Sequence, residues 1–459
     1  MRKREELAGK EAADADLGDA RLERRYGQLM EMMARGPDQS FPRASGDSDA
    51  ALEATYRFLN NESVEHEALL ASHYAKTLER MRADSEVLVV HDTTEFRFDG
   101  DREGLGRLHR DIQGFMGHFA LAVSADGQRR ALGVIGFLPV IRPWEKTKTS
   151  WRARYHDPSK ESLRWGKLVT EVVARTQNGP PLIHVMDREA DSFELLRGLI
   201  DEGQRLIVRV KAGERWTSDG GRVGDATQGL DVVAEREIGV SARKAQYMSG
   251  TGKSAPRPAR TQRPAKLQIR ACTVQLQPPD RVKGAPLTMN FVHVTEIDPP
   301  AGQEPVDWKL YTTDPIETAE QVLLVVDRYR SRWVIEEYFK AIKTGCAYEK
   351  RQLGSRRALL NALAIFVPIA WSLLVLRQEA RAKGTAPTAL TTIQLQVLRA
   401  VLRKPLPENP TAVEILLAIA ALGGHIKHNG EPGWQVLGRG FERLLSYEVG
   451  WRAATNDQS

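Results

Sequence analysis

Two short apolar runs, each ending in an aspartate, constrain the fold of this chain more than any other feature. Residues 87–90 read Val-Leu-Val-Val and are followed closely by Asp92, and residues 182–186 lead directly into Asp187. Buried parallel strands have this composition, with polar side chains where each strand leaves the sheet. An aspartate in that position can equally cap the helix that follows. The pattern therefore predicts a sheet covered by helices, and it leaves the role of the two acids open.

A hairpin and a helix are expected between these two runs. Apolar segments at 118–123 and 131–138 flank Ala125-Asp126-Gly127, and Asp-Gly is a strong signal for a β-hairpin turn. A helical pattern follows from about Glu161 to Arg175. Strand, hairpin, helix and strand in this order begin a ribonuclease-H-like fold. We therefore predict an α/β chain with a mixed sheet of this type.

A third acidic position lies in a predicted helix among other polar side chains. At about 100° per residue, four polar residues fall within about 60° on one helical face. They are Tyr329, Arg332, Glu336 and Lys343. Arg and Lys bind phosphates, Tyr donates a hydrogen bond, and Glu ligates metal ions. An ordinary ion pair between Arg332 and Glu336 would explain the spacing as well. Together with the two strand-end aspartates, however, Glu336 predicts three carboxylates around a divalent metal.

These motifs closely resemble the DDE cut-and-paste transposases of bacterial insertion sequences. Within them, the chain is similar to the group defined by a Tyr-Arg-Glu-Lys helix, which includes the transposase of a kanamycin-resistance transposon. The resemblance is carried by Asp92-Thr93-Thr94, by Asp187-Arg188-Glu189-Ala190-Asp191 and by the helix from Tyr329 to Lys343. Similar short motifs near both ends extend it over nearly the whole chain.

The resemblance implies roles for single residues. Asp92, Asp187 and Glu336 match the catalytic metal ligands, whereas Glu189 and Asp191 are expected to orient their turn. The residues that match the family's DNA contacts are Tyr329, Arg332, Lys343, Arg209 and Trp308. Stacking a flipped base on an indole is physically sound. A Trp after an apolar strand also suits a packed core, so both interpretations of Trp308 stay open.

Metal-assisted phosphoryl transfer is the chemistry that the resemblance implies. Three neighbouring carboxylates repel one another unless a cation offsets their charge. Mg²⁺ binds carboxylate and phosphate oxygens, and we expect two such ions per site, with Mn²⁺ as a substitute. The family nicks the ends of its element, forms and reopens a hairpin, and joins the 3′ ends to target DNA. It does so as a homodimer in a synaptic complex with two double-stranded DNA ends.

The chain is expected to contain three domains. Residues 1–70 read as helical and match the family's end-recognition domain, and residues 71–365 form the ribonuclease-H-like catalytic domain. A β-rich insertion is expected at about 212–305, with a basic loop that either contacts phosphate or is a solvated linker. Its cations are Lys253, Arg257, Arg260, Arg263 and Lys266. Residues 366–459 read as a helical bundle, the dimerisation domain by resemblance.

Composition limits the other possibilities. Lys and Arg number 66 against 60 Asp and Glu, a net charge of +6, so DNA binding must depend on local patches. Two cysteines provide no disulfide framework, and no apolar leader follows the first residues. We therefore expect a bacterial cytoplasmic protein, associated with the nucleoid when bound to DNA. The apolar stretch 358–376 contains Asn361 and Pro368, and we expect a buried helix there, partly in a subunit contact, and no membrane span.

Three alternative functions remain. The chain could be a DNA-binding regulator that does not cut, or a ribonuclease-H-like nuclease. It could also be a His/Asp metallohydrolase that uses His91, His118 and His184, although no His-x-x-x-His or His-x-Glu pair supports zinc.

Overall fold

The computed structural model describes residues 11–456, except for 47, 110–111, 145–156, 158–159, 212, 241, 243–258, 281, 283, 382–389, 391, 403–404 and 426–431. A helical region comes first. Its helices are α2 (Ala20–Arg35), α3 (Phe41–Ala44), α4 (Asp49–Leu59) and α5 (His66–Met81). Asp19 caps α2 by accepting a hydrogen bond from the Arg21 backbone N–H at 2.7 Å. The Tyr26 hydroxyl donates to the Leu69 carbonyl at 2.9 Å, which ties α2 to α5.

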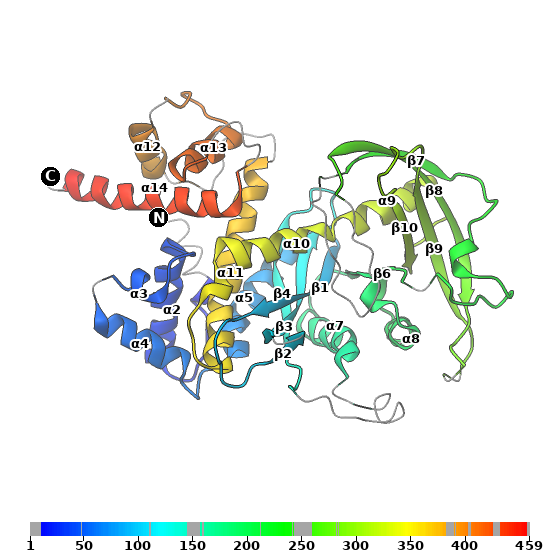
Figure 1. Cartoon of the computed structure of the whole chain (residues 1–459), viewed down its shortest axis with the longest axis horizontal. Coiled ribbons are helices and arrows are strands. Elements are labelled where there is room, and N and C mark those ends of the chain that lie inside the picture. Colours follow the sequence, from blue (N-terminus) through cyan, green and yellow to red (C-terminus); the bar gives the residue numbers. More distant parts are fainter. Residues whose placement is uncertain are drawn as a thin grey trace.

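A mixed sheet forms the centre of the molecule (Figure 1). Its first six strands are β1 (Val87–Arg97), β2 (Gly106–His109), β3 (Ile112–Ser124), β4 (Ala131–Val140), β5 (Leu182–Met186) and β6 (Arg205–Arg209). β3 is antiparallel to β1, β2 and β4, whereas β1, β5 and β6 run parallel to one another. The predicted hairpin joins β3 to β4, with Gly127 at φ +81° in the turn. The α/β prediction is confirmed, and the sheet is consistent with a ribonuclease-H-like core.

Helices cover this part of the sheet. α7 (Arg164–Arg175) follows a single 3₁₀ turn, η1 (Glu161–Leu163), and packs against β3 and β4. A second such turn, η2 (Arg188–Ala190), links β5 to α8 (Phe193–Asp201). Apolar residues repeat along one side of α7, and Leu168 and Val172 are fully buried against the sheet.

The expected β-rich segment extends the same sheet. Its strands are β7 (Ala234–Val240), β8 (Arg263–Leu276), β9 (Leu287–Glu296) and β10 (Asp307–Thr312), after the short turn η3 (Val223–Asp225). They pair antiparallel in sequence order, and β10 joins them to β6. Two cations of the expected basic loop, Lys253 and Arg257, lie outside the described residues. Arg263 lies on β8, where it pairs with Glu296.

The remaining chain is helical. It forms α9 (Ala319–Arg330), α10 (Trp333–Lys340), the π-helical turn η4 (Ala341–Gly345), the 3₁₀ turn η5 (Tyr348–Lys350), α11 (Arg356–Arg381), α12 (Thr392–Val401), α13 (Ala412–Leu422) and α14 (Trp434–Asn456). α11 is long and apolar enough to cross a membrane, but 89% of its apolar window is buried inside the protein. It is therefore a core helix here. The domain boundary expected at residue 365 falls inside α11.

The continuous helix predicted for residues 329–343 is wrong. α9 ends at Arg330 and α10 begins at Trp333. At the junction the Ser331 hydroxyl donates to the Asp327 carbonyl at 3.1 Å, a contact that bends helices. Backbone bonds then shorten to i→i−3, as from the Arg332 N–H to the Tyr329 carbonyl at 3.0 Å. Since η4 widens the next turn, the four polar residues do not share one straight face.

Candidate active site

Adjacent parallel strands bring the two aspartates to the same level. Val87 pairs with Leu182 and Val90 with Val185, and the same register continued for two residues places Asp92 beside Asp187. Asp187 also caps η2, accepting a hydrogen bond from the Glu189 N–H at 2.8 Å. The capping role that the sequence allowed is therefore present for Asp187, in addition to its position beside Asp92.

Arg332 links Asp92 to Glu336. One guanidinium nitrogen, Nη1, lies 2.8 Å from Asp92 Oδ2, and the other, Nη2, donates to Glu336 Oε1. α10 packs on β1, which brings Glu336 to the strand that carries Asp92. The Thr93 N–H donates to Asp92 Oδ1 at 2.8 Å. The structure therefore gathers Asp92, Arg332 and Glu336 in one contact.

The two other acids act on the ionisation of Asp92. Burial raises the pKa of Asp92 to about 7, and the charges of Asp187 and Glu336 act in the same direction. Arg332 opposes this rise. Burial disfavours the charge of Arg332, yet Asp92 and Glu336 raise the pKa of its guanidinium overall. The site thus holds repelling carboxylates that one guanidinium offsets in part.

The side chains present are suited in type to a divalent cation. Carboxylate oxygens are the ligands that Mg²⁺ prefers. In the described part of the chain, however, no group of three or more His, Cys, Asp or Glu side chains is arranged to hold a metal ion. The Arg332 guanidinium lies between Asp92 and Glu336. A cation ligated by both carboxylates therefore requires Arg332 to leave this position.

The five residues expected to contact DNA divide into three places. Tyr329 is buried, and the half-buried Trp308 meets its ring edge-on, with centroids 5.9 Å apart. Arg209, on the neighbouring strand β6, donates to the Asp307 carbonyl at 3.3 Å. Arg332 lies between the carboxylates, as above. Because Trp308 packs partly against the main core, the core interpretation of this residue has structural support.

Lys343 lies apart from these residues. Its ammonium donates to the Glu95 carbonyl at 2.5 Å and is 4.0 Å from Glu349. Burial lowers the pKa of Lys343, and Glu349 opposes this effect. Because Glu95 is on β1 three residues beyond Asp92, Lys343 is next to the site but outside the Arg332 contact.

One arginine that the sequence did not single out connects the two acidic turns. Arg164, at the start of α7, donates to Thr93 Oγ1 at 3.0 Å and pairs with Glu189 at 2.5 Å. The His118 ring nitrogen Nδ1 is also 2.9 Å from Thr93 Oγ1. Arg164 thereby holds the residue after Asp92 to the turn after Asp187. No pattern in the sequence distinguishes this Arg from other helix-terminal arginines.

The strand histidines form a hydrogen-bonded core. His91 Nε2 and His184 Nδ1 are 2.9 Å apart, and both rings are fully buried. Burial lowers the pKa of His91, His118 and His184, so these side chains are neutral near pH 7. Their mutual contacts account for their positions without a zinc ion.

Comparison with known proteins identifies two segments. Residues 4–64 match the family "Transposase DNA-binding", and residues 165–368 match "Transposase DDE domain". The second match contains Asp187 and Glu336, whereas Asp92 lies before it. Among solved structures, the chain is similar to a piggyBac transposase synaptic complex with hairpin DNA, studied by cryo-EM. That likeness has a TM-score of 0.34 and 10% identity, over 77% of this chain and 65% of the other. At this level the structural likeness carries no argument.

Proposed function

Because this chain carries a transposase DNA-binding domain and a transposase DDE domain, we propose that it moves a DNA element by cutting its ends and joining the 3′ ends to target DNA. The observation that carries the proposal is the Arg332 guanidinium that joins Asp92 to Glu336, on the strand that pairs with the one leading into Asp187. Residues 4–64 recognise the element's ends. Two copies of the chain act together on two ends.

The three carboxylates are the residues that would hold divalent cations. When bound, two Mg²⁺ ions would activate a water or a 3′-hydroxyl and stabilise the leaving oxygen. Asp92 and Glu336 would ligate a cation together only after the Arg332 guanidinium has moved away from them. Arg332 and Lys343 then contact phosphates beside the cleaved bond.

The other predicted contacts lie on the β10 side of the site. Arg209 assists in phosphate binding, and Tyr329 supports the Trp308 ring on which an extruded base stacks. The hairpin route from a nicked end to a blunt break is part of this proposal. It requires the base next to the break to leave the helix, which is the step that a stacking ring stabilises.

Cleavage of the element's own end tests the function. The full chain is incubated with Mg²⁺ and a duplex that spans the gene's flanking DNA, and the ends of all product strands are mapped. We expect Asp92→Asn to bind the duplex as the natural chain does, and to cut at least about 100-fold more slowly, the scale of losing one electrostatic stabiliser. The matched control is Glu337→Gln, which removes the acid next to Glu336 on α10.

Each outcome of this experiment separates one alternative. If the natural chain binds ends and never cuts them, it is a regulator that does not cut. If it cuts only RNA paired with DNA, it is a ribonuclease-H-like nuclease. Full activity in Asp92→Asn would show that the carboxylate assignment is wrong.

A further inference from the structure

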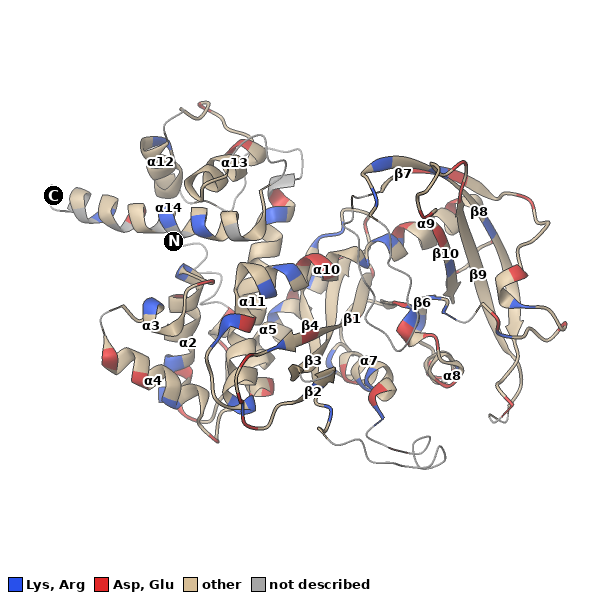
Figure 2. Cartoon of the chain, viewed as in Figure 1, with Lys and Arg blue, Asp and Glu red and all other residues tan. Residues whose placement is uncertain are grey.

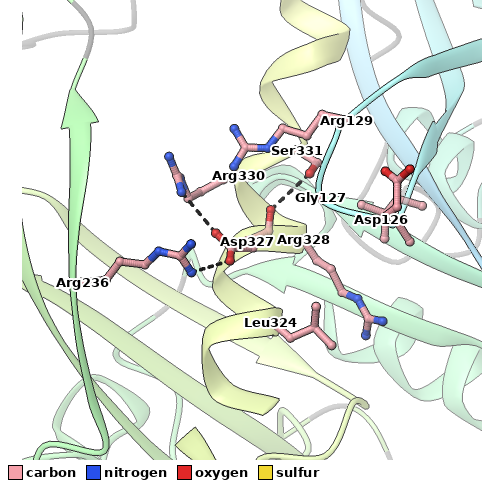
Figure 3. A pocket seen from close by; sticks show the side chains of 11 residues that line it. Asp126, Gly127, Arg129, Arg236, Leu324, Asp327, Arg328, Arg330 and Ser331 are labelled. Carbon is pink, nitrogen blue, oxygen red and sulfur yellow. Dashed lines mark hydrogen bonds and ion pairs between the residues drawn. The ribbon is translucent and has the colours of Figure 1, made fainter. Parts of the chain in front are cut away.

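A cavity of about 410 Å³ opens beside the candidate site and is not part of it (Figure 3). It lies between the β3–β4 turn, the start of β1 and the end of α9. Its charged lining residues are Asp126, Arg129, Arg236, Asp327, Arg328 and Arg330. Across the molecule, Lys and Arg alternate with Asp and Glu (Figure 2), so four arginines around one cavity are a local feature.

The acids on this lining do not neutralise its cations. Asp327 is shared between Arg236 and Arg330, and the Arg330 contact is 3.1 Å. Asp126 pairs with Arg130, which is not on the lining, at 3.1 Å. One shared carboxylate therefore faces two arginines here, and positive charge remains.

Arg328 completes the lining but is neutralised elsewhere. Its guanidinium pairs with Asp314 at 2.5 Å and with Glu86, and neither acid lies on the lining. The cationic character of the cavity therefore comes from Arg129, Arg236 and Arg330.

Among these three arginines, Arg129 has an unusual backbone conformation that a neighbouring helix stabilises. Its backbone has φ +55°, a left-handed conformation that non-glycine residues adopt rarely and that tends to mark functional positions. Gln378 of α11 fixes it, since the Gln378 amide donates to the Arg129 carbonyl at 2.8 Å and accepts from the Ala131 N–H at 2.8 Å. Among the residues that the structure describes, no carboxylate forms an ion pair with the Arg129 guanidinium.

Neighbouring charges confirm that the position favours an anion. Burial lowers the pKa of Arg129, the like charge of Arg330 lowers it further, and Asp327 only partly opposes them. A bound anion would relieve both the burial cost and the repulsion. Beside the ion pairs of Asp327 with Arg236 and Arg330, the lining therefore offers one cation, Arg129, that a bound anion would neutralise.

The cavity lies a short distance from the carboxylates, measured through the strand that joins them. Leu88 lines the cavity, and strand alternation puts it on the same face of β1 as Asp92, four residues or about 13 Å away. Ser331 also lines the cavity and directly precedes Arg332. Phosphates of one DNA strand advance about 3.4 Å each along the helix axis, so this distance corresponds to about four nucleotides.

We propose that this cavity, the Arg129 pocket, binds a phosphodiester of the DNA strand whose cleaved bond lies at Asp92, about four nucleotides from that bond. Because Ser331 on the lining directly precedes Arg332, a polymer that reaches both places is favoured over a free anion. The inference rests on the proposed function, because it takes the carboxylates as the point from which the strand is measured.

The test removes the phosphate charge and the arginine separately and together. Duplexes of the element's end carry one neutral methylphosphonate at each position from about two to six nucleotides from the cleaved bond. Binding to the natural chain should weaken about three- to tenfold at one of these positions, the scale of one charge-assisted contact. Arg129→Gln should bind the unmodified duplex correspondingly more weakly and be insensitive to the modification at that position.

Arg130→Gln is the matched control. It removes the same charge one residue away, from a side chain that pairs with Asp84 and Asp126 and does not line the pocket. It should stay as sensitive to the methylphosphonate as the natural chain. Thermal unfolding of both variants checks that the β3–β4 turn is intact.

Binding and cleavage are read in the same reactions, so the two proposals fail separately. If the natural chain cuts its end and every methylphosphonate acts equally on Arg129→Gln, the pocket inference is overturned and the function stands. If the natural chain binds but never cuts, the proposed function is wrong, and coupling between Arg129 and one phosphate still decides the pocket.

A competition with inorganic phosphate distinguishes DNA from a free anion. If inorganic phosphate displaces no DNA from the natural chain, the inference is supported. Displacement that requires Arg129, without sensitivity at any position, assigns the pocket to a free anion and overturns it.

Discussion

Asp92 stands in an environment that is unfavourable for its charge until a cation enters. It is half-buried near Asp187 and Glu336, and a single guanidinium offsets these acids in part. Enzymes that use metal ions commonly keep such charge repulsion in the metal-free protein, because ligands placed for a cation repel when it is absent. The cost should be measurable as lost stability.

Stability of the metal-free protein should therefore depend on the ionisation of Asp92. The folded pKa of about 7 lies above the ordinary value of 3.8, so the folded state holds this proton more tightly than the unfolded chain. As pH rises from about 4 through about 7, ionisation of Asp92 removes stability. Asp92→Asn cannot ionise, and with a chelator present its Tm should exceed that of the natural chain by about 1–3 °C near pH 8. The gain should disappear toward about pH 4, near the ordinary pKa of this side chain.

The control for this measurement is Glu337→Gln, which removes a negative charge from α10 next to Glu336 and leaves Asp92 in place. A Tm difference for Asp92→Asn that is constant across the pH range would contradict the account of Asp92. With saturating Mg²⁺, the Tm of the natural chain should exceed that of Asp92→Asn, because the ion stabilises only the folded state that binds it.

Among the elements, the strands were predictable and the helix junction was not. The apolar runs and the Asp-Gly turn fix β1, β3, β4 and β5, because alternation and turn chemistry act over a few residues. The junction at Ser331 depends on one hydroxyl that turns back to the Asp327 carbonyl. Ser occurs in straight helices too, so the sequence gives no sign of the break. The break matters, since it points Arg332 toward β1 while Tyr329 remains against Trp308.

Contacts between distant elements could not be predicted from the sequence either. The sequence allowed the ion pair between Arg332 and Glu336, whereas the contact of the same guanidinium with Asp92 was not expected. Arg164 and the Arg129 pocket also escaped notice, because each consists of residues from several elements. Lone arginines carry no spacing signal, and only the fold shows which ones share a carboxylate.

Asn361 is a buried polar side chain on the otherwise apolar helix α11. It is 1% exposed, and its amide donates to the Leu59 and Val64 carbonyls, both at 3.0 Å. Asn361→Leu removes both hydrogen bonds, although the Val64 carbonyl keeps a long contact with Arg357 at 3.4 Å. We expect the free energy of unfolding to fall by about 1–3 kcal/mol, measured by denaturant titration.

The comparison variant for α11 is Arg357→Gln. Arg357 contacts the same loop at its exposed edge, through Glu65 and the Glu62 carbonyl. Exposed contacts of this kind contribute little, so its loss should change stability by less than about 1 kcal/mol. Equal effects of the two substitutions would show that the buried amide contacts have no special weight.

As a whole, the molecule joins residues 20–81 to the sheet through one core, and its last helices add a second apolar cluster that packs on α11 and η4. Tyr26, Phe58, Val89 and Phe366 belong to one continuous apolar core. Arg351 adds contacts to the Pro37 and Gln39 carbonyls. α12–α14 pack around an apolar cluster of their own. If residues 4–64 bind DNA, that DNA is held in a fixed position relative to Asp92, and we propose that the last helices contact a second copy.

Two active sites per complex predict a particular effect of inactive chains. If each end is cut by one chain of a dimer, mixing equal amounts of the natural chain and Asp92→Asn before DNA is added leaves about a quarter of the dimers with two active sites. Products cut at both ends should fall to about a quarter, while products cut at one end accumulate. Chains that cut the two ends independently would also give about a quarter of the double cuts, so the mixing result is interpreted together with the mass of the complex. Mass measurement of the complex supplies the independent check, since two chains with two ends are required, and one chain on one end throughout the reaction would contradict the dimer.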